Sequence, residues 1–472
     1  MKQSLSQIIR QRGDLDWRHR LKLVATLSVP AIMSQVSAVV MEYIDAAMVG
    51  HLGADASAAI GLVSTTTWLF FGLTSAIAIG FSVQVSHLLG AGKPDDARSV
   101  LRQGLLASII ASLVLTGAGF AIARPLPHWL GGYESINSQA TLYFSIFILS
   151  LPVLQWNFLS SGMLRATGNM FVPGITGVLM CVLDVLFNFL LIFPPLDLAP
   201  YGIDVVLPRA GLGVAGAALG TAIASTVATA ILLLYLWFKG GELKLSGTSG
   251  SYRPTRLCLH RAVRIGMPMG LERFVSTAAQ IVMTIIVAPL GIYAIAANAF
   301  AITAEGICYM PGYGIGDAST TVVGQSIGAD KKDLAHKFAS TTLWLGMGVM
   351  TLMGIVMFIA APIMMEIMTP VKEIIDLGTT ALRIEAFAEP MFAAAIICYC
   401  SFVGAGDTVV PSIMNLGSIW IVRVTLAALL APEWGLAGVW FAMCIELCFR
   451  GSIFLWRFAS RRWMNREIIH HN

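Results

Sequence analysis

The stretch ATGNMFVP (residues 166–173) decides the fold, because a related stretch, GAGDTVVP (404–411), occurs later in the same chain. The glycine and the final proline occupy the same places in both stretches, and each pair is separated by 238 residues. Three further pairs of landmarks keep this offset: Pro30 and Pro268, Gly53 and Gly291, and Gly90 and Gly328. A constant offset over so many landmarks is hard to obtain by chance. The chain is therefore an internal duplication.

The duplication changes its offset once. GLGVAGAA (211–218) corresponds to EWGLAGVW (433–440), but here the matching glycines are 222 residues apart. The difference implies 16 additional residues in the first half, and the stretch PPLDLAPYGIDVVLPRAG (194–211) supplies them. We therefore expect an insertion at this point of the first half.

The composition is that of a membrane protein. The chain has 472 residues, of which 57% are hydrophobic and only 12% are charged, and its mean hydropathy is +0.77. A soluble protein carries about 25% charged residues. A helix of about 20 apolar residues crosses the hydrocarbon layer, whereas the strands of a membrane barrel alternate in hydropathy. The sequence therefore predicts an all-α polytopic membrane protein with about twelve spans, near 23–50, 58–88, 100–123, 138–165, 169–194, 213–239, 262–290, 294–326, 338–368, 375–404, 408–431 and 435–460.

Six spans in each half place the two copies in the membrane with the same orientation. Parallel repeats of this kind are related by an axis along the membrane normal. The polar stretch GGELKLSGTSGSYRPTR (240–256) is the natural linker. We expect an N-terminal six-helix lobe at 1–239, a cytoplasmic linker at 240–256 and a C-terminal six-helix lobe at 257–472, related by pseudo-twofold symmetry.

The distribution of basic residues predicts the orientation. With twelve spans, 23 of the 30 Lys and Arg residues fall on the side of the amino terminus. Cytoplasmic loops carry such an excess. The first 22 residues are a basic arm without the apolar core of a cleaved signal peptide. We expect a multi-pass protein of the cytoplasmic (inner) membrane with both termini in the cytoplasm. The formal net charge of +4 is then explained by the basic residues of the cytoplasmic loops, and binding to nucleic acid is not expected.

Enzyme chemistry finds little support in the sequence. The seven cysteines and eight histidines form no metal-ligand spacing, and we interpret the cysteines as apolar packing groups. The stretch HLLGAGKP (87–94) lacks the first glycine of a phosphate loop and has Pro94 where a magnesium-binding hydroxyl would stand. No nucleophile–base pair is apparent. We therefore expect a protein that is not an enzyme, with no catalytic residues and no cofactor.

Two parallel lobes are the layout of a transporter. The major facilitator superfamily shares this layout, so motifs must distinguish the families. The sequence resembles the multidrug and toxic compound extrusion (MATE) family over essentially its whole length. The motifs that carry the resemblance are YIDAAMVGHLG, GFSVQVSHLLGAGK, GMLRATGNMFVP, GAALGTAIAS, GMPMGLERF and SFVGAGDTVVP. The resemblance implies a V-shaped pair of helical bundles that exports organic cations in exchange for inward sodium or protons.

Asp45 is the first candidate site residue. It lies in the first span, in VVMEYIDAAMVGHLG (39–53), and an acid at membrane depth costs about 2.5–3.5 kcal/mol on insertion scales. The repeat equivalent is Met283, so the architecture does not require an acid here. The resemblance implies that Asp45 belongs to a cation or proton site of the N-terminal lobe. The alternative is a structural pair with a neighbouring donor.

The fifth span carries Asp184 and Asn188 four residues apart, which places them on one helical face. The related proteins usually have Asn first and then an acid or amide, and this order is reversed here. Thr221 matches a family threonine that contributes a hydroxyl oxygen. Asp45, Asp184, Asn188 and Thr221 therefore offer carboxylate, amide and hydroxyl oxygens, which suit sodium. Carboxylates can also carry a proton, and the sequence does not choose between these ions.

Four more acids within the spans are candidates for substrate binding or coupling. Glu42 lies one turn before Asp45 and either widens the acidic patch or contacts a neighbouring helix. The others lie in the second half: Glu272, Glu305 and Glu389. One branch of the family has an acid one turn after Glu272 and another at the place of Phe392, so this sequence departs from that pattern. Glu272 with Arg273, and Glu446 with Arg450, could also be structural pairs.

The sequence thus predicts a secondary antiporter that exports organic cations or drugs across the cytoplasmic membrane, coupled to inward sodium or proton flux. Its expected partners are small organic cations and the lipid bilayer, and we expect a monomer. The alternative is a flippase or exporter of a lipid-linked or amphipathic metabolite. That alternative predicts a basic central cavity, which the acids disfavour.

Overall fold

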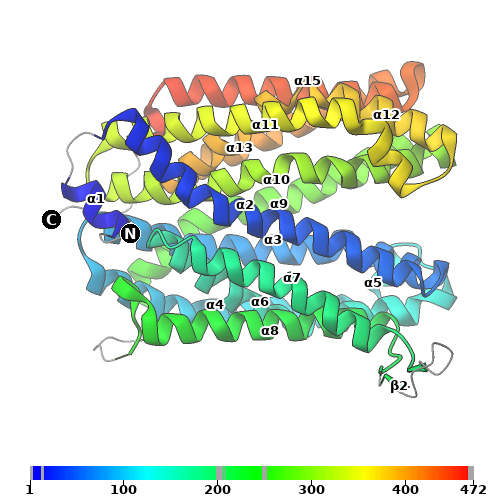
Figure 1. Ribbon diagram of the computed structural model, residues 1–472, viewed down its shortest axis with the longest axis horizontal. Helices are drawn as coiled ribbons and strands as arrows, with labels where there is room; N and C mark the ends of the chain where they lie inside the picture. Colours follow the sequence, from blue (N-terminus) through cyan, green and yellow to red (C-terminus); the bar gives the residue numbers. More distant parts are fainter. Residues whose placement is uncertain (1–3, 12–14, 198–205, 208, 247–251, 466–472) are drawn as a thin grey trace.

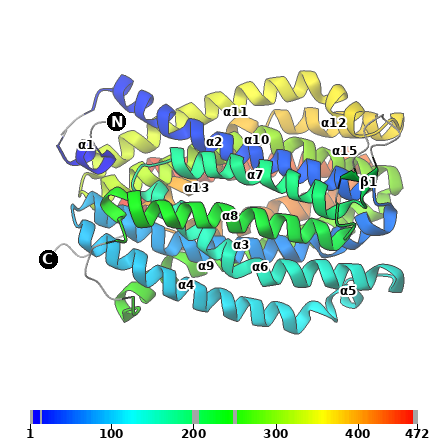
Figure 2. The same cartoon turned by 60° about the horizontal axis from the view of Figure 1, so that its bottom comes forward.

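The computed structural model describes residues 4–11, 15–197, 206–207, 209–246 and 252–465, and nearly all of them are helical. Figure 1 shows long, roughly parallel helices in two groups, with the first half of the chain below and the second half above. The helices of the N-terminal lobe are α2 (Trp17–Gly50), α3 (Ala54–Gly90), α4 (Pro94–Ala123), α6 (Glu134–Ala166), α7 (Phe171–Ile192) and α8 (Val214–Lys239). Figure 2 brings α4, α6, α7 and α8 of this lobe forward.

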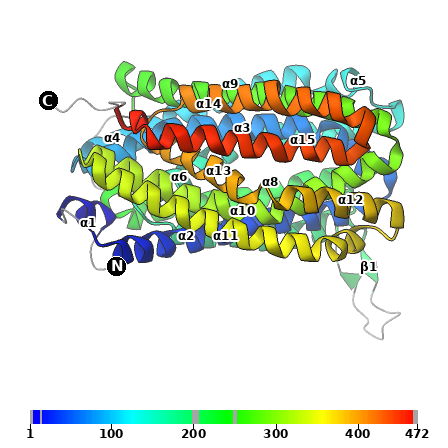
Figure 3. The ribbon, with the colours of Figure 1, turned by 90° about the horizontal axis from the view of Figure 1, so that it is seen from above.

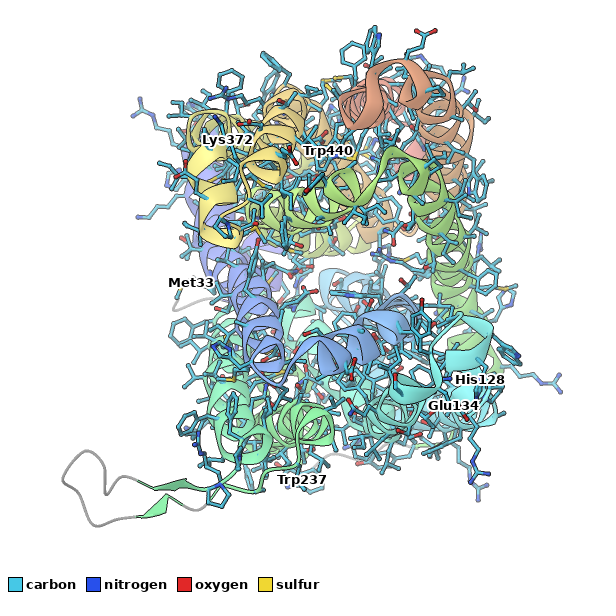
Figure 4. All side chains as sticks on the ribbon, turned by 90° about the vertical axis from the view of Figure 1, so that its right-hand side faces the viewer. Met33, His128, Glu134, Trp237, Lys372 and Trp440 are labelled. Atoms are coloured by element: carbon cyan, nitrogen blue, oxygen red, sulfur yellow. The ribbon has the colours of Figure 1, made fainter. Side chains whose placement is uncertain are left out.

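The elements of the C-terminal lobe are α9 (Arg256–Val287), α10 (Ile292–Gly328), α11 (Lys332–Met368), α12 (Lys372–Ala386), α13 (Glu389–Gly404), α14 (Val409–Gly417), a π-helical segment (Ser418–Val424) and α15 (Thr425–Ala459). This lobe repeats the arrangement of the N-terminal lobe, except that its fourth span is broken into α12 and α13 and that a π-helical segment follows α14. Viewed along the helices, the N-terminal lobe, marked by His128, Glu134 and Trp237, lies below the C-terminal lobe, marked by Lys372 and Trp440 (Figure 4).

Ten helical stretches among the described residues are long and apolar enough to span a membrane, and the bent pair α12–α13 adds an eleventh. One of the ten, Val409–Ala459, is 51 residues long and contains Gly435 with non-helical dihedral angles (φ 58°, ψ −139°). This glycine divides the stretch at the boundary expected between the last two spans. The twelve-helix, two-lobe architecture predicted from the sequence is therefore confirmed.

The tenth span is broken, although the sequence predicted one span over 375–404. Helices α12 and α13 meet at an angle of 59°. Pro390 is the second residue of α13 and lacks a backbone N–H, and its ring obstructs the preceding turn. The bend therefore follows from a proline that the sequence interpretation passed over.

Glycines with positive φ recur at equivalent places in the two halves. Gly53 (φ 111°) precedes α3 and Gly291 (φ 99°) precedes α10. Gly168 (φ 85°) and Gly406 (φ 83°) lie in the duplicated stretches that begin at 166 and 404. Side chains other than glycine are disfavoured at such angles, so the repeated glycines specify the same turns twice.

The lobes meet closely at the end where α3 and α10 terminate. A Cβ atom on Gly90 would collide with the Gln325 carbonyl, and one on Gly328 would collide with the His87 carbonyl. The Gln325 amide donates to the Ala166 carbonyl oxygen (2.6 Å). The guanidinium of Arg165 in α6 pairs with Asp317 in α10 at 2.8 Å, which adds an ion pair between the lobes. The structure is therefore closed at this end.

A short amino-terminal helix, α1 (Leu5–Gln11), lies across the closed end (Figure 3). Ser6 Oγ donates to Glu242 Oε1 beside the N-terminal lobe (2.7 Å). From the C-terminal lobe, Lys331 Nζ donates to the carbonyl oxygens of Ile9 and Arg10, both at 2.8 Å. We call α1 the strap. The sequence suggested only a basic arm here.

The expected insertion in the first half forms two short antiparallel strands, β1 (Leu196–Asp197) and β2 (Val206–Leu207), at the opposite end of the molecule (Figure 1). Residues 198–205 and 208 of the insertion lie outside the described residues. These strands are the one departure from an all-helical architecture within the described ranges.

Candidate functional site

Side chains from α2 and α7 meet at a cluster of acids in the N-terminal lobe. Asn188 Nδ2 donates to Asp45 Oδ1 at 2.7 Å and to Asp184 Oδ2 at 3.0 Å. Asp184 and Asn188 are fully buried, and Asp45 is partly exposed. One amide therefore bridges carboxylates of two helices. We call Asp45, Asp184, Asn188 and Thr221 the N-lobe acid site.

The sequence of α8 makes room for this site. Gly220, in the GAALGT motif, lies so close to Asn188 that a Cβ atom would collide with the amide oxygen. The next residue, Thr221, donates to the Ala217 carbonyl oxygen of its own helix (3.2 Å) and its side chain also interacts with Asp184. The small residue and the hydroxyl thus bring α8 against α7 at the level of the acids.

Two oxygens in this site are buried and have no hydrogen-bond partner in the described part of the chain: Asp184 Oδ1 and Asn188 Oδ1. A buried polar atom without a partner is costly, and such atoms in a native structure need an explanation. Together with Asp45 they form an oxygen donor set of the kind that hard cations prefer. The same carboxylates can accept a proton. The arrangement therefore leaves oxygen atoms that a cation or a proton can bind.

Two further residues accompany the N-lobe acid site. Glu42, one turn before Asp45 on α2, is exposed and interacts electrostatically with Asp45. Tyr143 of α6 lies within electrostatic range of Asp45, Asp184 and Glu42, and packs against the cluster that contains Val49 of α2 and Ile192 of α7. The sequence interpretation missed Tyr143, because nothing in TLYFS (141–145) distinguishes it from a packing residue.

The C-terminal lobe holds a second group of acids around the bend between α12 and α13. Glu385 lies in the last turn of α12, Glu389 begins α13 and Glu305 comes from α10; all three are buried. Both carboxylate oxygens of Glu385 and of Glu389 have no hydrogen-bond partner among the described residues. We call Glu305, Glu385 and Glu389 the C-lobe glutamates. Broken helices often form binding sites in transporters. Glu385 was not among the predicted site residues.

Glu446 of α15 is held in an ion network. It pairs with Arg450 of the same helix (2.6 Å) and with Arg423 of the π-helical segment (2.7 Å). Ser418 Oγ donates to the same carboxylate (2.5 Å). The structural interpretation of Glu446 with Arg450 is therefore what the structure shows, with Arg423 as an additional partner.

Glu272 of α9 lies in neither group. Its two carboxylate oxygens accept from the Tyr399 hydroxyl and the Asn415 amide, both at 2.7 Å. The neighbouring Arg273 instead packs its alkyl chain against Gly72 of α3. Glu272 therefore connects α9 with α13 and α14.

Comparison with known proteins identifies the family. The family model MatE matches residues 30–190 and, again, residues 268–429. The two matches begin 238 residues apart, which is the offset of the internal duplication. Together they cover more than half of the chain, so the chain belongs to the MatE family. Members of this family are transporters and not enzymes, and the chain is accordingly a multi-pass membrane transporter.

Relatives of full length agree with this assignment. The probable multidrug resistance protein NorM of Thermotoga maritima is 25% identical over 453 residues, which are 95% of this chain and 94% of that protein. The uncharacterized transporter YisQ of Bacillus subtilis is 24% identical over 425 residues, 89% of this chain and 90% of that protein. A crystal structure of a mutant of the MATE transporter VcmN from Vibrio cholerae has the same fold, with a TM-score of 0.84, 18% identity and coverage of 96% and 99% of the two chains.

Proposed function

We propose that the protein is a secondary antiporter of the bacterial cytoplasmic membrane, which exports organic cations and drugs in exchange for inward sodium or protons. Its full-length relatives named multidrug resistance proteins support the export of drugs. The observation that carries the coupling is the Asn188 bridge between Asp45 and Asp184. A cation or proton that binds there changes the contacts between α2 and α7.

The coupling follows from the charge of the site. Without a bound ion, Asp45 and Asp184 place two carboxylates around one amide, and like charges at this distance repel. A bound sodium ion or proton neutralises them and draws α2 and α7 together. Pro30 interrupts the hydrogen-bond ladder of α2 between the closed end and Asp45, so α2 can bend there. Ion and substrate are then coupled because they favour different arrangements of the lobes.

The C-lobe glutamates and Glu42 supply negative charge for an organic cation. Glu385 and Glu389 leave four carboxylate oxygens without hydrogen-bond partners in the described residues, so they can receive a positively charged group. Both groups of acids belong to one chain, and we propose that a monomer is the functional unit. With basic residues concentrated at the closed end, that end faces the cytoplasm, as do both termini.

Transport of a fluorescent organic cation by proteoliposomes tests this function, with sodium and proton gradients imposed separately. We expect one of the two ion gradients to drive transport of the dye against the concentration gradient of the dye. Asp45→Asn should abolish the gradient-driven component, whereas the matched Asp55→Asn, an exposed acid at the start of α3, should keep it. Gradient-driven transport by a well-expressed Asp45→Asn protein would contradict the mechanism.

A further inference from the structure

A groove runs between the two lobes at the closed end, where the start of α2 lies beside the start of α11 (Figure 3). Its volume is about 480 Å³. From α2 it is lined by Trp17, Arg20 and Leu21, and from α11 by His336, Lys337, Ser340, Thr341, Trp344 and Leu345. The groove lies far from the bends and acids described above, and the proposed antiport does not use it.

The head of the groove is cationic and rich in hydrogen-bond donors. Arg20 and Lys337 bring positive charge from opposite lobes, and the hydroxyls of Ser340 and Thr341 lie one turn further along α11. None of the lining residues is acidic. The nearest acid on α11, Asp333, is exposed and pairs with Arg461 instead (3.5 Å). Such a head is complementary to an anion with several acceptor oxygens, such as a phosphate group.

Two buried nitrogens at the head of the groove are without hydrogen-bond partners in the described part of the chain. They are Arg20 Nε and His336 Nδ1. Arg20 uses Nη1 to donate to the Leu15 carbonyl oxygen (2.6 Å), which fixes the guanidinium in the groove. The His336 ring is fixed by stacking on Phe458 (4.8 Å between centroids). Arg20 Nε is therefore a positioned donor that lacks the acceptor that buried donors normally have, and His336 Nδ1 is a second donor in the tautomer that carries its proton on this nitrogen.

The groove becomes apolar along its length. Trp344 and Leu345 lie seven and eight residues beyond Lys337, or about 10 Å along the same face of the helix. Trp17 and Trp344 are 56% and 69% exposed. Tryptophan with one apolar and one polar edge is typical of the membrane–water interface. A ligand that fits both ends has an anionic head and an acyl chain.

We propose that this groove binds an anionic phospholipid, with its phosphate at Arg20, His336 and Lys337 and an acyl chain along Trp344 and Leu345. Basic pockets between membrane helices on the cytoplasmic side are suited to such head groups. Because α2 belongs to one lobe and α11 to the other, a bound lipid joins the lobes at the closed end. It therefore stabilises the conformation in which that end is closed.

Thermal unfolding of the full chain in neutral detergent tests the proposal, with phosphatidylglycerol, phosphatidylcholine or inorganic phosphate added. The groove variant is Arg20→Gln with Lys337→Gln. The matched control is Arg18→Gln with Lys22→Gln, which removes the same charge from exposed positions of α2 outside the groove. We expect phosphatidylglycerol to raise the midpoint of the wild type and the control. The groove variant should need roughly tenfold more lipid for the same shift.

Three outcomes would overturn the proposal. Equal shifts with phosphatidylcholine would show that charge is not recognised, and equal shifts with inorganic phosphate would show that an acyl chain is not needed. An equally weakened response to phosphatidylglycerol in the groove variant and in the control would show a general effect of net charge.

A second measurement on the wild-type protein does not depend on the folding of a variant. Photoactivatable phosphatidylglycerol in vesicles should label peptides from the starts of α2 and α11. Labelling confined to other helices would also overturn the proposal.

Discussion

Asn188 is the residue on which the N-lobe acid site depends, because its amide contacts both aspartates and its oxygen faces Gly220. Asp184 and Asn188 could be recognised from their spacing on one helical face, and Asp45 from its depth in an apolar span. Their meeting could not be predicted by spacing, because it requires α2 and α7 to pack side by side. Tyr143 was missed because it stands in an ordinary apolar span, and Glu385 because it lies inside the stretch 375–404 that was predicted as one unbroken span.

Replacement of Gly220 by alanine should disrupt the N-lobe acid site without removing any polar group. The new methyl group collides with the Asn188 amide and displaces it from Asp45. Overpacking of this kind costs about 1–3 kcal/mol. We expect at least a tenfold loss of gradient-driven efflux, measured with a fluorescent cation in proteoliposomes.

Gly61→Ala is the matched control for Gly220→Ala, because a Cβ atom on Gly61 meets no atom within 4 Å. This substitution in α3 should leave efflux unchanged. Equal loss in the two variants would argue against a specific role of the Gly220–Asn188 contact.

Glu446 should contribute to stability through its ion network. Glu446→Gln leaves Arg423 and Arg450 with a neutral partner in a buried environment, and breaking a buried pair costs about 3–5 kcal/mol. The thermal unfolding midpoint in detergent should fall clearly, while Glu433→Gln, an exposed position earlier in α15, should not change it. An unchanged midpoint for Glu446→Gln would contradict the stabilising role of this glutamate.

At the scale of elements, the bend between α12 and α13 is the feature that the sequence could have revealed. Pro390 is a strong signal for a break, but the apolar stretch around it reads as one span by length and hydropathy alone. The bend matters because two buried glutamates, Glu385 and Glu389, lie on either side of it. Elements that hydropathy defines were therefore predicted, whereas the change of direction inside one element is signalled by its proline and not by hydropathy.

Pro390→Ala should test the purpose of the bend. Alanine restores a backbone donor and removes the ring, so α12 can continue into α13. We expect weaker binding of the transported cation, measured by its apparent affinity in efflux, with a folded and monodisperse protein. Pro362→Ala in α11, where the proline lies within a continuous helix, should leave the apparent affinity unchanged. The same loss of affinity in both variants would count against the bend.

At the scale of the whole molecule, the duplication specifies two lobes and the contacts between lobes select one conformation. Repeated glycines were visible in the sequence, and Gly90 and Gly328 indeed lie where the lobes cross. The pairing of Arg165 with Asp317 was not predictable, because the two residues lie in different lobes. The sequence around either residue gives no sign of its partner. Contacts between the two halves depend on the final geometry rather than on local patterns.

The Arg165–Asp317 pair should favour closure of the end that carries α1. The pair is partly exposed, so its contribution is about 0.2–1 kcal/mol. Arg165→Asp places two acids opposite each other and should lower the rate of efflux several-fold. The exchanged variant, Arg165→Asp with Asp317→Arg, should recover part of that rate. Absence of any recovery would show that the two charges act separately.

The strap has a consequence for the timing of transport. Leu5, Ser6 and Ile9 are buried at the closed end, and Lys331 of the opposite lobe is bonded to the backbone of α1. When this end opens, α1 must break its hydrogen bonds either with Lys331 or with Glu242. We therefore expect the strap to lengthen the dwell time of the closed state. Shortening the chain from its amino terminus should change the frequency of opening more than the affinity for any transported ion.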